Sequence, residues 1–384
     1  MVKYRLGDIC EIVSGSTPKT GVSEYWDGDK KWITPAEITD ESYIITDSVR
    51  ELTELGVTKT GLSSFPKGTV ILSSRAPIGK VAIAGCEMYC NQGFKNLICS
   101  QKIYNRYLYW FLKGNTEYLN SLGRGATFKE ISKQIVASIE INVPDMEQQM
   151  QAAENLERVS SIIRLRKQEL QKLDDLIKAR FVELFGDVIC NSKSWEMLAF
   201  TDIASSRLGK MLDTKRQTGE SSYPYLANFN VQWFKFNIKN LNQMDFNIED
   251  RIEFELLDGD LLVCEGGEIG RCAVWHNEIQ PCFFQKALHR VRCNRQIVHP
   301  DYLAWWFKYN CDHDGFAAIA GAKATIAHLP GVKLKQLRVA IPPLKLQEQF
   351  AAFVTQTDKS KAVIQKALDE TQLLFDSLMQ EYFG

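Results

Sequence analysis

The chain has 384 residues, of which 45% are hydrophobic and 24% charged, and its formal net charge is −1. These are ordinary globular values, the length allows two domains with cores of their own, and near-neutral charge gives no general attraction to nucleic acid. No run of 18 apolar residues exists, which excludes a transmembrane helix. Ten scattered cysteines favour free thiols and a cytoplasmic setting, and the first residues lack the apolar core of a signal peptide.

A long internal repeat organises the chain. The segment 183–186 reads Glu-Leu-Phe-Gly, and the segment 381–384, which lies 198 positions later, reads Glu-Tyr-Phe-Gly. Because the repeat is long, it indicates two related domains rather than a solenoid. Two similar surfaces suit a ligand or partner with approximate two-fold symmetry.

Each copy opens with short loop and strand-like segments. The clearest match lies mid-domain, where Gly68 and Gly79 are 11 residues apart, as are Gly259 and Gly270, and a basic residue follows each second glycine. Apolar runs that end in glycine-rich turns predict β-rich domains. In chain order the other paired segments are 8–9 with 202–203, 14–19 with 207–211, 31–35 with 223–227, and 92–95 with 285–288.

An aromatic helix is predicted later in each copy. Trp110 and Phe111 in the first copy, and Trp305 and Trp306 in the second, stand beside leucine and tyrosine at helical spacing. That spacing indicates core residues rather than a base-stacking surface. Each globular part then ends in an apolar strand that leads into proline, at Pro144 and at Pro342-Pro343.

Two long helices follow these prolines, at 146–185 and 345–383. The first segment has neither glycine nor proline, and its apolar residues recur in alternating steps of three and four, which is the pattern of a coiled-coil seam. A helix of roughly 38 residues is about 57 Å long. We expect the two helices to pack antiparallel on each other; the alternative is that each packs on a partner protein. The predicted seam residues are Leu156, Val159, Ile163, Leu170, Leu173 and Ile177, then Phe350, Ile364, Leu374 and Leu378.

Catalytic motifs are missing from the sequence. No phosphate-binding Gly-x4-Gly-Lys-Ser/Thr loop, no Gly-x-Gly-x-x-Gly after a strand, no Asn/Asp-Pro-Pro-aromatic methyltransferase motif and no nuclease carboxylate cluster is present. All five histidines lie in the second copy, so catalysis shared by both copies cannot use histidine. Buried free cysteines are the better interpretation of a possible zinc set, whose members would be Cys272, His276, Cys282, His289 and Cys293.

The residues that remain are polar and basic side chains on loops, repeated in both copies. Arginine, lysine, glutamine and asparagine can hydrogen-bond base edges, and serine and threonine can reach phosphates. The alternative for each single residue is a solvated loop position. The candidate DNA-binding residues are Ser16, Thr17, Lys19, Ser74, Arg75, Lys80, Gln92, Lys95, Arg124, Thr127 and Lys129, then Arg207, Lys210, Arg271, Gln285, Lys286, Lys323 and Thr325.

The order of globular domain, long helix ending in Phe-Gly, second domain and second helix resembles the specificity subunit of type I restriction-modification enzymes. The segments 14–18 and 125–127 and the links from Pro144 to Gln148 and from Pro343 to Gln347 carry the resemblance, which covers the whole chain. The first link has one proline where the second has two, which leaves the helix start open.

The resemblance implies an α+β chain of two β-rich target recognition domains in tandem, with two long helices forming an antiparallel coiled coil. We place the recognition domains at 1–145 and 187–343 and the helical spacers at 146–186 and 344–384. The second Phe-Gly would complete a second unit, so a two-domain subunit is expected rather than a half-length one that must dimerise.

The same resemblance implies a non-catalytic subunit with no cofactor of its own. Double-stranded DNA, two modification subunits that carry S-adenosylmethionine, and restriction subunits that use ATP and Mg²⁺ would be the partners, without any membrane. Each domain would read one half of a bipartite, asymmetric site, and the helices would set its spacing. Two rival classes stay open: a self-contained restriction-methylation enzyme, and a scaffold that bridges two proteins.

Overall fold

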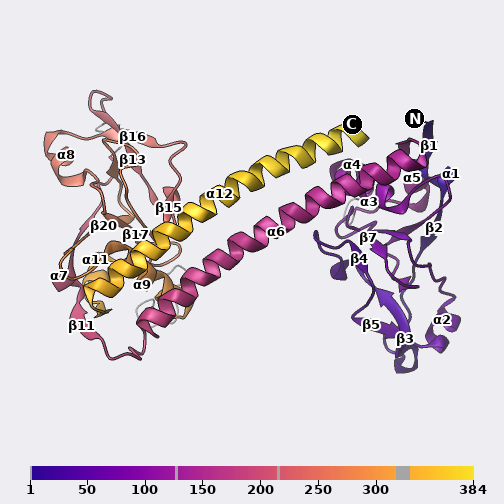
Figure 1. Cartoon of the computed structure of the whole chain (residues 1–384), viewed down its shortest axis with the longest axis horizontal. Coiled ribbons are helices and arrows are strands. Elements are labelled where there is room, and N and C mark those ends of the chain that lie inside the picture. The colour runs from indigo at the N-terminus through magenta and orange to yellow at the C-terminus, as the bar shows by residue number, and fades with distance from the viewer. Residues whose placement is uncertain (1, 126–128, 214–216, 317–328) are drawn as a thin grey trace. The chain divides into compact units, whose positions relative to one another are not determined.

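A computed structural model describes residues 2–125, 129–213, 217–316 and 329–384 (Figure 1). The chain divides into two compact units: unit 1 comprises Met1–Lys167 with Gln365–Gly384, and unit 2 comprises Gln168–Ile364. Each unit therefore combines one globular part with a portion of both long helices. No helix in the described ranges is long and apolar enough to cross a membrane.

The globular part of unit 1 contains two main sheets. One has five strands in the order β2-β9-β6-β7-β4, and the other has three in the order β5-β3-β8. Strands β1 and β10 form a separate antiparallel pair. The elements are β1 (Val2–Arg5), α1 (Leu6–Ile9), β2 (Cys10–Ser14), η1 (Ser23–Tyr25), β3 (Trp26–Ile33), η2 (Pro35–Glu37), β4 (Ile44–Ile45), β5 (Arg50–Leu52), α2 (Glu54–Thr60), β6 (Val70–Leu72), β7 (Val81–Ala84), β8 (Tyr89–Cys90), β9 (Lys95–Cys99), α3 (Asn105–Gly114), α4 (Thr116–Ser121), α5 (Lys133–Ser138) and β10 (Glu140–Val143).

Unit 2 repeats this plan. Its main sheets have the orders β12-β20-β17-β18 and β16-β13-β19, and β11 pairs with β21 as β1 pairs with β10. The elements are β11 (Glu196–Ala199), α7 (Phe200–Ile203), β12 (Ala204–Leu208), β13 (Ser222–Leu226), η4 (Asn228–Asn230), β14 (Val231–Gln232), β15 (Lys235–Phe236), β16 (Asn242–Asp245), α8 (Ile248–Phe254), β17 (Leu261–Cys264), β18 (Cys272–Val274), β19 (Phe283–Phe284), β20 (Leu288–Cys293), α9 (Pro300–Asp312), α11 (Gly331–Lys335) and β21 (Arg338–Ile341).

The aromatic helices α3 and α9 lie in the cores of their units. Trp110, Phe111, Trp305 and Trp306 are all buried, so the interpretation of these residues as core is confirmed. The apolar runs of β6 and β17 are buried along their whole length, which explains why their sequences are continuous rather than alternating in hydrophobicity.

The long helices are α6 (Met146–Phe185) and α12 (Leu344–Phe383), and they run antiparallel within each unit. In unit 1, Asn155 donates to the hydroxyl of Tyr382 at 3.0 Å, and Arg166 donates to Thr371 further along. In unit 2, the Lys361 ammonium lies 2.6 Å from Asp174. Residue numbers rise along one helix as they fall along the other.

One predicted seam residue is wrong. Leu374 is 51% exposed, whereas Leu368 is buried and Phe375 packs on the ring of Trp110. A straight helix advances 3.6 residues per turn and drifts by about 20° per heptad from a strict seven-residue repeat. Between Phe350 and Leu374 this drift accumulates, so Leu374 turns toward solvent and Phe375 takes the inward-facing position. The other predicted seam residues are buried or half-buried.

A buried glutamine fixes the start of each long helix. Gln149 is 1% exposed; its carbonyl oxygen accepts the Tyr104 N–H at 2.7 Å, and its amide donates to the carbonyls of Lys102 and Pro144. Gln347 makes the matching bonds with the N–H of His299 and the carbonyls of Ile297 and Pro342.

These bonds settle the helix start that the sequence left open. Pro144 corresponds to Pro342, and the matching glutamine of the first copy is Gln149, not Gln148. Because Met146 and Leu344 are equivalent by the same count, both helices start at the same point of the repeat.

The repeated Phe-Gly marks the place where a helix end packs on an aromatic helix. In unit 2, Phe185 of α6 lies against Tyr302 of α9, with ring centroids 4.8 Å apart. In unit 1, Phe383 of α12 lies against Tyr107 of α3 at 4.9 Å. The end of each long helix therefore completes a core that other parts of the chain begin.

Candidate nucleic-acid interface

Three loops that are distant in the sequence meet in unit 1. The Ser74 N–H donates to the Gly93 carbonyl at 2.7 Å, and the Ile131 N–H donates to the Ser74 carbonyl at 3.0 Å. Arg124 and Glu130 exchange backbone hydrogen bonds on the third loop. The candidate residues of segments 74–75 and 92–95, together with Arg124 and Lys129 of the third loop, are thus brought to one place.

A partly buried ion pair links these loops. The Lys95 ammonium is 3.1 Å from the Glu130 carboxylate and 3.2 Å from the Ser74 hydroxyl, and Arg75 approaches Glu130 to 3.9 Å. Lys95 is 7% exposed and Ser74 is fully buried. The assignment of these two residues to DNA contact is therefore corrected, because their side chains are used inside the protein to hold the loops together.

The loops surround a concave pocket of about 480 Å³ that includes Thr34, Pro35, Ala36, Arg75, Ala76, Asn91 and Glu130. Gln92, which follows the pocket residue Asn91, is exposed, and its side-chain carbonyl oxygen accepts a hydrogen bond from the Thr17 hydroxyl at 2.5 Å. The other exposed candidates of unit 1 are Lys19, Arg124 and Lys129, with Ser16 and Arg75 half-buried.

The basic residue that follows the second glycine of each copy holds the backbone of a turn. Lys80 donates to the carbonyl of Pro35 in η2 at 3.2 Å, and Arg271 donates to the carbonyl of Asn228 in η4 at 3.1 Å. Both side chains are half-buried. These hydrogen bonds direct the charged groups at the protein's own carbonyls, so both residues support their turns, and their contact with DNA stays a prediction.

Matched backbone bonds set the register between the copies. The backbone N–H of Asn91 donates to the Ile33 carbonyl in unit 1, and the backbone N–H of Gln285 donates to the Leu226 carbonyl in unit 2. Asn91 therefore corresponds to Gln285, and the predicted pairing of Gln92 with Gln285 is wrong by one residue. Gln92 corresponds instead to Lys286, which is also exposed. Single-residue shifts of this kind escape a comparison of two short, divergent loops.

The same register places His289 where unit 1 has Lys95. His289 is buried, and its Nε2 lies 3.2 Å from the carbonyl oxygen of Leu329. The backbone N–H of Leu329 in turn donates to the backbone carbonyl of Glu265. Burial lowers the pKa of His289 below its usual value, and Nε2 is the donor in this bond because a carbonyl oxygen can only accept. The two copies therefore support the same loop by different chemistry, which no sequence comparison indicated.

Gly15 and Gly209 are required by close approach of the chain. A Cβ atom at Gly15 would lie 2.0 Å from the Cys90 carbonyl oxygen, and one at Gly209 would lie 2.3 Å from Gln285. Each glycine lets the loop after β2 or β12 touch the strand beside it. The following residues, Ser16 and Lys210, then make equivalent backbone bonds.

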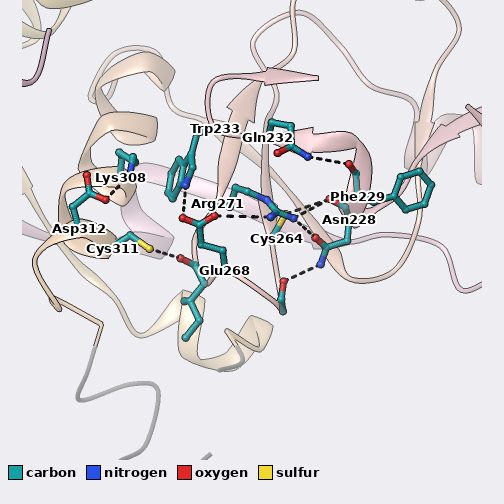
Figure 2. Close-up of polar contacts among 12 residues, drawn as sticks. Asn228, Phe229, Gln232, Trp233, Cys264, Glu268, Arg271, Lys308, Cys311 and Asp312 are labelled. Atoms are coloured by element: carbon teal, nitrogen blue, oxygen red, sulfur yellow. Dashed lines mark hydrogen bonds and ion pairs between the residues drawn. The ribbon is translucent and has the colours of Figure 1, made fainter. Parts of the chain in front are cut away.

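Figure 2 shows a polar network in unit 2 that sequence reasoning missed. The Arg271 guanidinium donates to the side chain of Asn228 at 2.7 Å and faces Glu268, which accepts the indole N–H of Trp233 at 2.6 Å. Asn228 also donates to the Gly266 carbonyl. The predicted match of 31–35 with 223–227 is out of register by one residue, because Ile33 corresponds to Leu226 and Pro35 to Asn228, so it did not reach Asn228.

Two further candidates in unit 2 are ion-paired within the protein. Lys210 lies 2.6 Å from Asp250 and donates to the Asp245 carbonyl, while the exposed Arg207 pairs with Glu253. To contact a DNA phosphate, Lys210 and Arg207 would have to break these ion pairs. The candidates Thr127, Lys323 and Thr325 lie outside the described residues.

The possible zinc set is not assembled. Among the described residues, no group of three or more histidine, cysteine, aspartate or glutamate side chains is placed to hold a metal ion. Cys272 and Cys282 are buried free thiols, and burial raises the pKa of both.

The family model for the type I restriction modification DNA specificity domain matches residues 1–175 and 192–371. The chain therefore belongs to this family and carries two specificity domains in tandem, which confirms the resemblance drawn from the sequence.

Curated relatives carry the corresponding name. The type I restriction enzyme MjaIX specificity subunit of Methanocaldococcus jannaschii is 39% identical over 186 residues, which are 48% of this chain and 43% of that protein. The HindI specificity subunit of Haemophilus influenzae is 25% identical over 145 residues, 37% of this chain and 31% of that protein. The chain thus spans less than half the length of these relatives.

Solved structures share the fold over the whole chain. The S subunit of a type I restriction-modification system from M. genitalium has a TM-score of 0.62 at 13% identity, with 100% of this chain and 96% of that chain covered. A chain from a structural study of type I system assembly and conformational transition has a TM-score of 0.59 at 15% identity, covering 99% and 97%.

Proposed function

We propose that this protein is the DNA-recognition subunit of a type I restriction-modification complex. Each unit reads one half of a bipartite site through the loops that follow β2, β6 and β8 in unit 1 and their counterparts in unit 2. The subunit performs no chemistry itself. The methyl donor, ATP and Mg²⁺ belong to its partners.

One observation carries this proposal: the two units share their supporting contacts but differ in their exposed loop residues. The bonds of Gln149 and Gln347 are the same, as are those of Lys80 and Arg271 to their turns. At the exposed positions, however, Gln92 corresponds to Lys286. Loops on a common scaffold carry recognition, so different loops favour different half-sites.

We further propose that the long helices bind two modification subunits. Several large apolar side chains on α6 and α12 are exposed, which is unusual for a helix surface that faces only water. Examples are Met150, Ile162 and Leu165 on α6, and Val363 and Leu373 on α12. A scaffold that bridges two proteins would use the same helices, but it would not need divergent loops.

The test combines purification with methylome sequencing. The chain is coexpressed with candidate modification subunits, and the purified complex is assayed for sequence-selective binding to double-stranded DNA. Methylome sequencing of cells with and without the gene should then reveal one bipartite adenine-methylation motif that depends on it. A complex without sequence selectivity, together with an unchanged methylome, would reject DNA recognition and favour the scaffold.

A further inference from the structure

The turn η4 in unit 2 displays an aromatic side chain to solvent. Phe229 is 57% exposed, and Figure 2 shows its ring pointing away from the contacts of Arg271 and Asn228. The corresponding residue of η2 in unit 1 is Ala36, which lines the concave pocket of the recognition loops. Phe229 therefore lies at the recognition loops of unit 2 and is specific to that unit.

The backbone beneath Phe229 is held from several sides. Asn230 is 1% exposed; it accepts the Ala227 N–H at 2.9 Å and donates to the Asn237 carbonyl at 2.9 Å. On the other side, Arg271 binds both the carbonyl and the side chain of Asn228.

Two further bonds complete the support. The Asn228 amide donates to the Gly266 carbonyl at 2.9 Å, and Gln232 donates to the carbonyl of Phe229 itself at 3.1 Å. All of these bonds use neighbouring residues or the backbone of Phe229, so none of them depends on the ring. A fixed turn that presents an exposed ring is a preorganised contact, because little entropy is lost when a partner covers it.

The chemistry of the ring limits what it can recognise. A phenyl ring has no hydrogen-bonding group, so it cannot read the donors and acceptors of base edges. Among the features that base pairs present in the major groove, the thymine 5-methyl group is the apolar one. We propose that Phe229 contacts a thymine methyl group in the half-site read by unit 2 and thereby adds specificity for that base.

This inference rests on the proposed function, and its test uses DNA that differs by single methyl groups. The full-length chain is assembled with its modification subunits and bound to DNA duplexes that carry the motif identified by methylome sequencing. Each thymine of the motif is replaced in turn by deoxyuridine, which keeps base pairing and removes only the methyl group. Binding is measured for the wild type and for Phe229→Ala, Phe229→Leu and Ile252→Ala.

We expect the wild type to lose about fourfold in affinity at one thymine, as for one buried methyl group. Phe229→Ala should bind the thymine duplex about fourfold more weakly than the wild type does, and should bind the deoxyuridine duplex no more weakly than the thymine duplex. Phe229→Leu should restore part of the preference for thymine over deoxyuridine. Ile252→Ala removes another exposed apolar side chain of unit 2 and should behave as the wild type.

Equal wild-type binding of thymine and deoxyuridine at every position would overturn the inference while leaving sequence-selective binding intact. A loss in Phe229→Ala that simply adds to the deoxyuridine loss would also overturn it, and would indicate a ring inserted between base pairs instead. Failure of the wild-type complex to select any sequence would reject the proposed function itself.

Discussion

Single buried polar side chains determine how the globular parts connect to the long helices. Gln149 and Gln347 each form hydrogen bonds with backbone N–H and carbonyl groups that have no hydrogen-bond partner within a strand or helix. Buried groups of this kind are costly to leave unpaired, so a side chain of fixed length becomes essential at one position.

Substitution of either glutamine should therefore destabilise one unit. Gln149→Ala leaves the N–H of Tyr104 and the carbonyls of Lys102 and Pro144 without their partner, at a cost of about 1–3 kcal/mol in the free energy of unfolding. Hydrogen exchange should show faster exchange in unit 1 for this variant and in unit 2 for Gln347→Ala. The neighbouring Gln148 is exposed, so Gln148→Ala is the control, and an equal effect there would contradict the role of Gln149.

His289 predicts a pH dependence of unit 2. Its pKa in the folded chain is lowered by burial, so the unfolded chain binds the proton more readily. Stability should thus be complete above the ordinary histidine pKa of about 6.5 and should fall as pH drops below it. Chemical denaturation between pH 7.5 and 5 should show a smaller dependence for His289→Gln. Burial also lowers the pKa of His299, so part of the dependence of stability on pH should remain in His289→Gln. If stability depended on pH in His289→Gln as strongly as in the wild type, the role of His289 would be refuted.

The sequence could locate the candidate DNA-binding loops but could not distinguish their buried residues from their exposed ones. Lys95 and Lys129 are both lysines of the candidate segments, yet Lys95, at the start of β9, is buried against Glu130 and Lys129 is exposed. Burial depends on the pairing of β2 with β9, which brings Ser14 opposite Lys95 from 81 positions away. No local pattern carries that information.

At the scale of elements, the long helices were the most predictable part of the fold. Their lengths and pairing follow from composition and periodicity, because a seam of buried side chains needs one residue every three or four positions. The missed detail at Leu374 arises because a seven-residue repeat is an approximation to the true helical period. Short strands such as β8 and β19, of two residues each, carry too little pattern to be predicted.

The docking of helix ends on the aromatic helices makes a strong prediction for α6. Phe181 is 1% exposed and contacts the rings of Tyr302 and Phe350. Phe181→Ala should lower the unfolding free energy of unit 2 by about 3–5 kcal/mol, as for other buried phenylalanines. Denaturant unfolding followed by tryptophan fluorescence measures this change. The adjacent Val182 is 43% exposed, and Val182→Ala should change little; comparable losses in both variants would contradict the docking.

At the scale of the whole molecule, the repeat keeps its framework and changes its loops. That division predicts that the halves of the recognised motif can be altered one at a time. Gln92 and Lys286 are equivalent, exposed and on separate units, so each should affect only its own half-site. A lost bidentate base contact costs about 1–3 kcal/mol of discrimination, or roughly 5- to 150-fold at one base pair.

Methylome sequencing of cells that carry each variant tests this independence. Gln92→Ala should relax one position in one half of the motif, Lys286→Ala should relax one position in the other half, and the double variant should show both changes without new ones. Thr17→Val, which removes the hydroxyl that holds Gln92, should weaken the same position as Gln92→Ala. A change that spreads over both halves would mean that the two units do not read DNA separately, because a contact confined to one loop cannot alter base preference at a site read by the other.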